Sequence, residues 1–167
     1  KKRNMKKVIK AVENLGASFI PKNKFKFPIT LISSEIPVGF KFYNGISSQI
    51  KSAVILGAVN SFGKTTIVER IKSRDHTEKI LLHNHKSVKV KKGKKNVIII
   101  NGKKSLKPFN LFVPSDPSSA SFPIVAALIT RNSKVELHNV MINHARNGLF
   151  DTLQEMGAKL KIFNEKK

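Results

Sequence analysis

The chain has 167 residues, a formal charge of +22 and 40% hydrophobic residues, which is enough apolar material for the core of one or two small domains. The longest apolar stretch, 121–130, is too short to cross a bilayer, and the basic first residues do not lead into the continuous apolar segment of a signal peptide. The lack of cysteine excludes disulfides and thiolate chemistry and is compatible with a reducing compartment. We therefore expect a cytoplasmic protein without a membrane span.

The positive charge raises the question of nucleic-acid binding. Of the 32 basic residues, 27 are lysine and five are arginine, although arginine is the residue that favours base readout and bidentate phosphate recognition. The densest lysine run, 86–97, alternates with valine as in a solvated strand and hairpin. A basic surface can also concentrate anionic metabolites. We predict no nucleic-acid partner, and a basic nucleic-acid-binding module remains an alternative.

The apolar periodicity predicts alternating helices and strands. Apolar residues at helical spacing predict a first helix over 5–17, with Gly16 near its end, and serines ahead of an apolar face predict a second helix over 47–60. Runs of β-branched and aromatic residues predict strands between them, near 18–20, 28–33 and 38–43. Further along we expect, in chain order, a strand at 65–70, a helix at 75–83, a hairpin at 87–100 turning near Gly93, a strand at 108–113, a helix at 118–132 and a strand at 134–139.

The order of helix and strand then repeats along the chain. Residues 47–70 resemble 118–139 at a displacement of 70 to 71 residues, and both begin with serines ahead of an apolar helix. A second similarity links 13–17 to 154–158, displaced by 141 residues, close to twice that period. Two agreeing offsets indicate partly covered copies of one unit, and such a unit predicts an α/β fold in which units share a core.

Five segments keep the order and spacing of one enzyme family. They are RNMKKV from Arg3, SSQIKSAVILGA from Ser47, SRDHTEKIL from Ser73, PSDPSSASFPIVAALI from Pro114 and INHARNGL…LQEMGA from Ile142. Through these segments the chain resembles the 5-enolpyruvylshikimate-3-phosphate (EPSP) synthases over nearly its whole length, as an internal fragment of the longer enzyme.

The resemblance implies an α/β (α+β) fold. Members of this family have two globular domains, each built from repeated βαβαββ units, and the active site lies in the cleft between the domains. By this resemblance, residues 1–113 would complete the first domain and residues 114–167 would begin the second, so that the architecture is an incomplete two-domain one. The chain would pass through the hinge near Pro114.

The resemblance also implies substrate-binding residues, with physical reasons beside it. Arg3 corresponds to a family arginine that contacts phosphoenolpyruvate, although Asn4 replaces the usual proline. Ser47 and Ser48 would hold the phosphate of shikimate 3-phosphate at a helix start, where free amides and the helix dipole attract anions. Gln49 would lie where both substrates meet, and Arg74, directly before another helix, would also contact shikimate 3-phosphate. Without the family, ordinary helix capping is the better explanation of the two serines.

A cluster in the second part of the chain is interpreted differently. Asp116, Ser118 and Ser119 begin a helix there, and Arg146 lies in NHARNG, where the family commonly has NPTRTG. We interpret these residues as caps and hinge packing.

In the family, the 5-hydroxyl of shikimate 3-phosphate attacks C2 of protonated phosphoenolpyruvate, and the tetrahedral intermediate then loses phosphate. No metal or organic cofactor is implied, and the full-length enzyme is expected to be a monomer. The proton-transfer groups lie outside the matching stretch, so we predict no catalytic residue here and no synthase activity for the isolated chain. The sister enzyme that acts on UDP-N-acetylglucosamine shares the fold and remains a second alternative.

Overall fold

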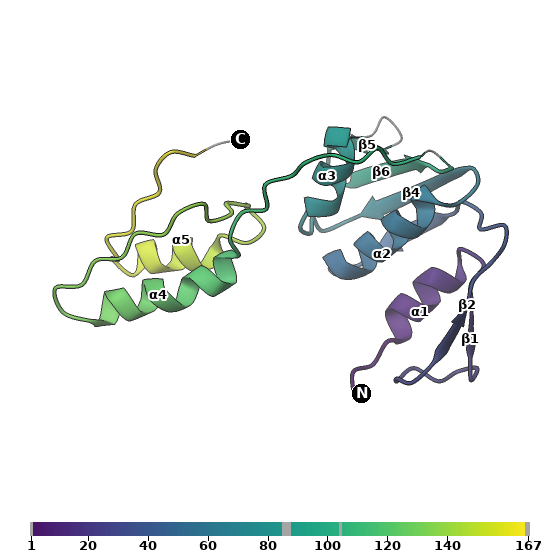
Figure 1. The fold of residues 1–167 in the computed structure, drawn as a ribbon, viewed down its shortest axis with the longest axis horizontal. Helices are drawn as coiled ribbons and strands as arrows, with labels where there is room; N and C mark the ends of the chain where they lie inside the picture. The colour runs from purple at the N-terminus through teal and green to yellow at the C-terminus, as the bar shows by residue number, and fades with distance from the viewer. Residues whose placement is uncertain (1, 85–87, 104, 166–167) are drawn as a thin grey trace. The chain divides into compact units, whose positions relative to one another are not determined.

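The computed structural model describes residues 2–84, 88–103 and 105–165, and the chain divides into two compact units, residues 1–109 and 110–167 (Figure 1). Mixed helices and strands confirm the α/β class. Within the described ranges, none of the helices has the length and apolarity needed to cross a bilayer. The division between the units falls just after Phe109.

Unit 1 contains one complete strand–helix–strand–helix–strand–strand unit, preceded by a helix and a hairpin. Its elements are α1 (Lys6–Glu13), β1 (Ser18–Ile20), β2 (Thr30–Ile32), β3 (Lys41–Asn44), α2 (Ser48–Val59), β4 (Lys64–Glu69), α3 (His76–Asn84), β5 (Val88–Lys91) and β6 (Asn96–Asn101). From β3 to β6 this is the βαβαββ order that the resemblance implies. The preceding α1, β1 and β2 match the last three elements of such a unit.

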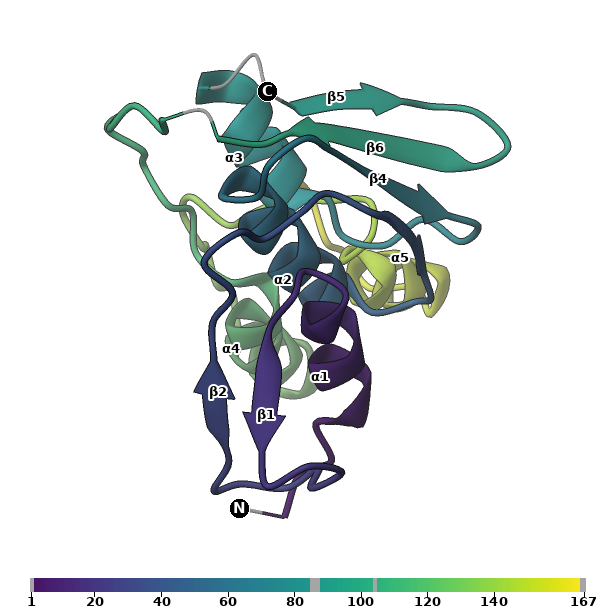
Figure 2. The ribbon, with the colours of Figure 1, turned by 90° about the vertical axis from the view of Figure 1, so that its right-hand side faces the viewer.

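The sheet topology places the starts of two helices at one edge. Strand order is β3-β4-β6-β5; β3 and β4 are parallel, whereas β4–β6 and β5–β6 are antiparallel. Because α2 follows β3 and α3 follows β4, both helices begin at the carboxyl edge of the parallel pair. Figure 2 shows both helices on the same side of the sheet. In α/β proteins, ligands bind at this edge.

The core of unit 1 lies between these helices and the sheet. The buried residues of α2 recur at helical spacing, and those of β4 alternate along the strand, as expected for elements with one face on a core. Its largest apolar members include Ile55, Ile67, Ile98 and Ile100, each at most 1% exposed. Full burial of such a side chain stabilises the fold by about 1.5–3 kcal/mol.

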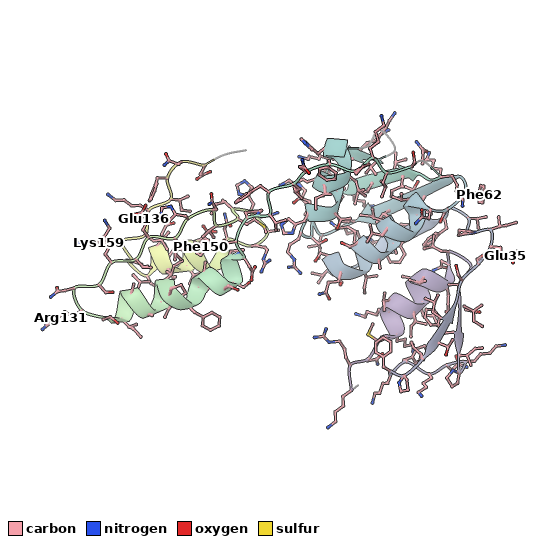
Figure 3. The ribbon with its side chains drawn as sticks, in the orientation of Figure 1. Glu35, Phe62, Arg131, Glu136, Phe150 and Lys159 are labelled. Carbon is pink, nitrogen blue, oxygen red and sulfur yellow. The ribbon has the colours of Figure 1, made fainter. Side chains whose placement is uncertain are left out.

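Unit 2 is much less enclosed. Its helices are α4 (Pro117–Ile129) and α5 (Gly148–Glu155), and one parallel bridge joins Ser115 to Val140. Phe150 of α5, labelled in Figure 3, is 4% exposed and is the largest buried apolar side chain described in this unit. The side chain of Asp116 caps α4 by accepting a hydrogen bond from the Ser119 amide (3.3 Å).

The backbone supports the longer of the two repeat offsets. Gly16, after α1, has φ 96°, and Gly157, after α5, has φ 91°. Each amide donates to the carbonyl three residues earlier, on Glu13 and on Gln154, at 2.9 Å in both cases. Glycine adopts a φ near 90° more readily than any other residue, so the two helices end in the same way, with the glycines 141 residues apart.

Two predicted strands are wrong. Residues 108–113 and 134–139 form no strand in the structure, apart from the single bridge beside them. Both segments have the residue types of a strand, but pairing needs a neighbouring strand, and unit 2 offers none within its described residues. Helix α5 was not among the predicted elements, and α1 ends at Glu13, earlier than predicted. Residue 87, where the predicted hairpin begins, lies outside the described residues.

Candidate functional site

The start of α2 presents amide donors at the carboxyl edge of the sheet. Ser47 is the N-cap, with extended backbone (φ −81°, ψ 110°), and its hydroxyl accepts a hydrogen bond from the Ile50 amide at 3.3 Å. Its carbonyl accepts from the Lys51 amide at 3.2 Å. The amides of Ser48 and Gln49 have no acceptor within the helix, because the first turn of any helix lacks one. They are therefore the groups through which this helix end can bind an anion.

Arg74 meets this helix end from the next strand–helix connection. Its Nε donates to Ser48 Oγ at 3.1 Å, and both side chains are half-buried. The guanidinium has five donors, and this bond uses one of them. A cation beside the positive end of a helix dipole is unfavourable by itself, and an anion bound there would offset both charges. The arrangement is therefore suited to a phosphate or carboxylate.

The other two predicted site residues are less fixed. Gln49 is exposed in the first turn of α2, next to Ser48. Arg3 is exposed ahead of α1, and no hydrogen bond or ion pair among the described residues joins it to the Ser48–Arg74 pair. Asn4, which stands where the family has proline, accepts a hydrogen bond from the Lys6 amide at 2.8 Å. The structure thus brings Ser47, Ser48 and Arg74 together and leaves Arg3 in the segment that leads into α1.

A buried ionic cluster that the sequence-based predictions do not include lies behind the helix start. Lys51 Nζ lies 3.1 Å from Glu69 Oε1 and 2.6 Å from Glu78 Oε1, and all three side chains are at most 5% exposed. Lys51 occupies the first position of the stripe that continues through the buried residues of α2. That helical spacing was the available signal, since it places a lysine on the core-facing side.

The start of α4 in unit 2 also has an arginine bonded to a serine of the first turn, but here a carboxylate pairs with the arginine. Arg146 donates to Ser118 Oγ, as Arg74 donates to Ser48, but it also forms a 2.8 Å ion pair with Asp116. Desolvation tends to raise the pKa of Asp116, but the Ser118 amide, the Arg146 charge and Ser119 outweigh it and lower that pKa. Because a carboxylate already pairs with the arginine, this helix start is capped internally. That geometry agrees with caps rather than with an anion site.

The described residues do not include a candidate metal site. No group of three or more histidine, cysteine, aspartate or glutamate side chains there is arranged to hold a metal ion. The chemistry of the site, as far as the described residues define it, is that of anion binding by amides, hydroxyls and a guanidinium.

Comparison with known proteins assigns the chain to a family. Residues 1–167 match the EPSP synthase family, described as 3-phosphoshikimate 1-carboxyvinyltransferase. The chain therefore belongs to the EPSP synthase family of transferases. Proteins of that name from Parvibaculum lavamentivorans and Petrotoga mobilis are 37% and 40% identical to it, each over 99% of this chain.

The solved structures agree with the family assignment. An EPSP synthase from Acinetobacter baumannii superimposes with a TM-score of 0.80 at 34% identity, covering 99% of this chain and 38% of that one. The fold predicted from the resemblance is confirmed. The chain spans only 37% of the length of the Parvibaculum relative and 38% of the Petrotoga relative.

Proposed function

We propose that these residues act as part of a longer EPSP synthase. That enzyme transfers the enolpyruvyl group of phosphoenolpyruvate to the 5-hydroxyl of shikimate 3-phosphate and releases phosphate. The observation that carries the proposal is the 3.1 Å contact between Arg74 and Ser48 at the start of α2, at the carboxyl edge of the parallel strands. A helix start and a guanidinium converge there on the space that a phosphate group would occupy.

Each predicted residue then has a role in binding. The amides and hydroxyls of Ser47 and Ser48, with the guanidinium of Arg74, bind the phosphate of shikimate 3-phosphate. Gln49 lies beside both substrates, and Arg3 binds phosphoenolpyruvate once the rest of the cleft is present. The buried strand–helix framework keeps these donors in place before the substrate arrives, which lowers the entropy lost on binding.

The remaining assignments follow from the family. We propose that residues 1–113 complete one enolpyruvyl-transferase domain and that 114–167 begin the next, with a cytoplasmic, monomeric full-length enzyme. The proton-transfer groups of such an enzyme would come from outside these residues. This chain would supply part of the anion site and no catalytic residue.

The test is an assay of the complete reading frame that encodes these residues. With shikimate 3-phosphate and phosphoenolpyruvate, we expect phosphate release and an enolpyruvyl product, and we expect growth without aromatic amino acids in a bacterial strain that lacks its own synthase. The purified 167-residue chain alone should show neither. A complete protein without this activity would contradict the proposal, and turnover by the isolated chain would contradict its partial character.

The two alternatives give different results in the same preparation. An enzyme of the sister class would consume UDP-N-acetylglucosamine in place of shikimate 3-phosphate. A nucleic-acid-binding module would bind arbitrary duplex DNA with affinity that falls steeply as salt rises, and shikimate 3-phosphate would not affect it.

A further inference from the structure

Three buried ionic side chains belong to the same elements that carry the candidate phosphate site. Lys51 lies one turn into α2, after Ser48; Glu69 is the last residue of β4; and Glu78 lies in the first turn of α3, just after Arg74. The cluster therefore joins the helix that offers the amides to the connection that offers the guanidinium.

The contacts within the cluster centre on one carboxylate oxygen. Glu69 Oε1 lies 3.1 Å from Lys51 Nζ and accepts hydrogen bonds from Ser73 Oγ at 2.7 Å and from Asn44 Nδ2 at 3.3 Å. Lys51 Nζ also contacts Glu78 Oε1 at 2.6 Å. Ser73 directly precedes the candidate arginine, so the cluster fixes the backbone on that side of it.

A second contact fixes the other side. Ser52 Oγ and Thr77 Oγ1 lie 2.7 Å apart, and Ser52 Oγ donates to the Ser48 carbonyl at 2.9 Å. Arg74 thus lies in a short segment whose two flanks, at Ser73 and Thr77, are both tied to α2 or β4. Its reach to Ser48 depends on where those flanks are held.

Stability alone does not account for these buried charges. Removing charged groups from water is unfavourable, and well-packed hydrophobic replacements of such clusters are often as stable or more stable. Lys51 is 0% exposed, so its ammonium lies away from the solvent that a substrate would occupy. Both observations are consistent with a cluster that acts by holding neighbouring residues in place and does not contact the substrate itself.

We propose that Lys51, Glu69 and Glu78 form a positioning cluster for the candidate phosphate site. The cluster sets the separation between Arg74 and the amides at the start of α2, so that both contact one phosphate group. This inference rests on the proposed function and adds residues to the binding site that do not touch the substrate. A misplacement of about 1 Å caused by a mutation away from the substrate can lower catalytic efficiency by up to about 100-fold.

The test replaces the cluster without leaving an unpaired charge. The variant Lys51→Met/Glu69→Gln/Glu78→Met keeps similar side-chain volumes and retains a hydrogen-bonding group at position 69. Its matched control is Lys10→Met/Glu13→Gln, which removes the partly exposed ion pair of α1. Both are made in the complete protein, and kinetic constants are measured per folded molecule.

We expect the KM for shikimate 3-phosphate to rise about 10-fold or more in the cluster variant. The KM for phosphoenolpyruvate should stay within about threefold, and the control should match the parent. A purely structural role would lower the folded fraction and leave both KM values unchanged. A folded variant with an unchanged KM for shikimate 3-phosphate would overturn the proposal.

Two further measurements keep the proposal testable. If the triple variant does not fold, the single variant Glu78→Gln, which retains an oxygen for Lys51, should raise the KM for shikimate 3-phosphate at least about threefold. The positioning role is rejected if neither variant folds or if this KM is unchanged.

In the 167-residue chain, the Arg74 Nε–H NMR signal should exchange with water at least about tenfold faster in the triple variant. That signal reports on positioning even if the complete protein lacks the proposed activity, and unchanged exchange would contradict the inference.

Discussion

At the start of α2, a capped helix end and a guanidinium contribute positive potential at the same place. Ser47 caps the helix, and Arg74 donates a hydrogen bond to Ser48, the residue after the cap. Neither feature is unusual by itself, since serine is among the preferred caps and arginine often contacts hydroxyls. Their coincidence at the carboxyl edge of parallel strands distinguishes this helix start from that of α4, where Asp116 pairs with the arginine.

The cap of α2 makes a stability prediction. Ser47→Ala removes the oxygen that accepts from the Ile50 amide, and should reduce the free energy of unfolding by about 1 kcal/mol. Urea unfolding followed by circular dichroism measures the change. Ser105→Ala, an exposed serine of the same unit outside any helix, is the control and should have little effect. Equal changes in the two variants would argue against the cap.

The cap of α4 makes a prediction about pH. The pKa of Asp116 lies below its ordinary value of 3.8. A lowered folded-state pKa means that this carboxylate stabilises the fold at pH above about 4, and that the contribution is lost as pH falls through the lower folded value. Carbon-detected NMR titration should show this pKa, and Arg146→Gln should move it upward. No change in Arg146→Gln would contradict the ion pair as a cause.

At the scale of single residues, the candidate anion-binding groups can be predicted from the sequence, whereas the buried ionic cluster behind them cannot. Ser47, Ser48 and Arg74 could be identified because helix starts have recognisable caps and because the family motifs include them. Lys51 was overlooked because lysine is almost always exposed. Its partners lie far away in the sequence, so the contacts that bury it become visible only when β4 and α3 are folded against α2.

At the scale of elements, helices were predicted more accurately than strands. The helix predicted at 47–60 was found as Ser48–Val59, because both its cap and its apolar face are local properties of the sequence. The strands predicted at 108–113 and 134–139 were wrong because a strand depends on a partner that the sequence pattern does not specify. Leu111, Phe112 and Val113 are more than half exposed, which is what unpaired strand-like residues would show.

The two faces of α2 give a paired prediction. Ile55 is 0% exposed, whereas the adjacent Leu56 is 52% exposed. Ile55→Ala removes buried methyl groups and leaves a cavity, and should destabilise unit 1 by about 2–5 kcal/mol. Leu56→Ala should change the free energy of unfolding by less than about 1 kcal/mol. Chemical denaturation of both variants decides this, and a larger effect at Leu56 would mean that the burial assigned to α2 is wrong.

At the scale of the whole molecule, the two units differ in how much core they contain. Unit 1 has a continuous core of buried residues from helices and sheet, whereas the buried apolar side chains described in unit 2 are Pro117, Ala120 and Phe150. Hydrogen exchange should therefore be much slower for the amides of β4 and β6 than for those of α4 and α5, since local opening needs less free energy where less surface is buried. Comparable protection in both units would contradict this account.

The repeated unit explains why so much of the fold could be predicted. One complete βαβαββ unit lies between β3 and β6, and the elements on either side match parts of the same pattern. The comparisons confirm the prediction that the chain is a fragment of a longer enzyme, because it covers 37% and 38% of the length of two relatives. The net charge of +22 raises the question of a nucleic-acid partner without answering it, because net charge does not report where the cations lie.

The central claim is that Arg74 and the start of α2 bind the phosphate of shikimate 3-phosphate. Steady-state kinetics of Arg74→Ala in the complete protein tests it most directly, with Arg70→Ala, an exposed arginine in the same connection, as the control. Loss of charge-assisted hydrogen bonds worth about 1.5–3 kcal/mol should raise the KM for shikimate 3-phosphate about 10- to 100-fold, while the control stays near the parent value. An unchanged KM in Arg74→Ala, or an equal rise in Arg70→Ala, would contradict the claim.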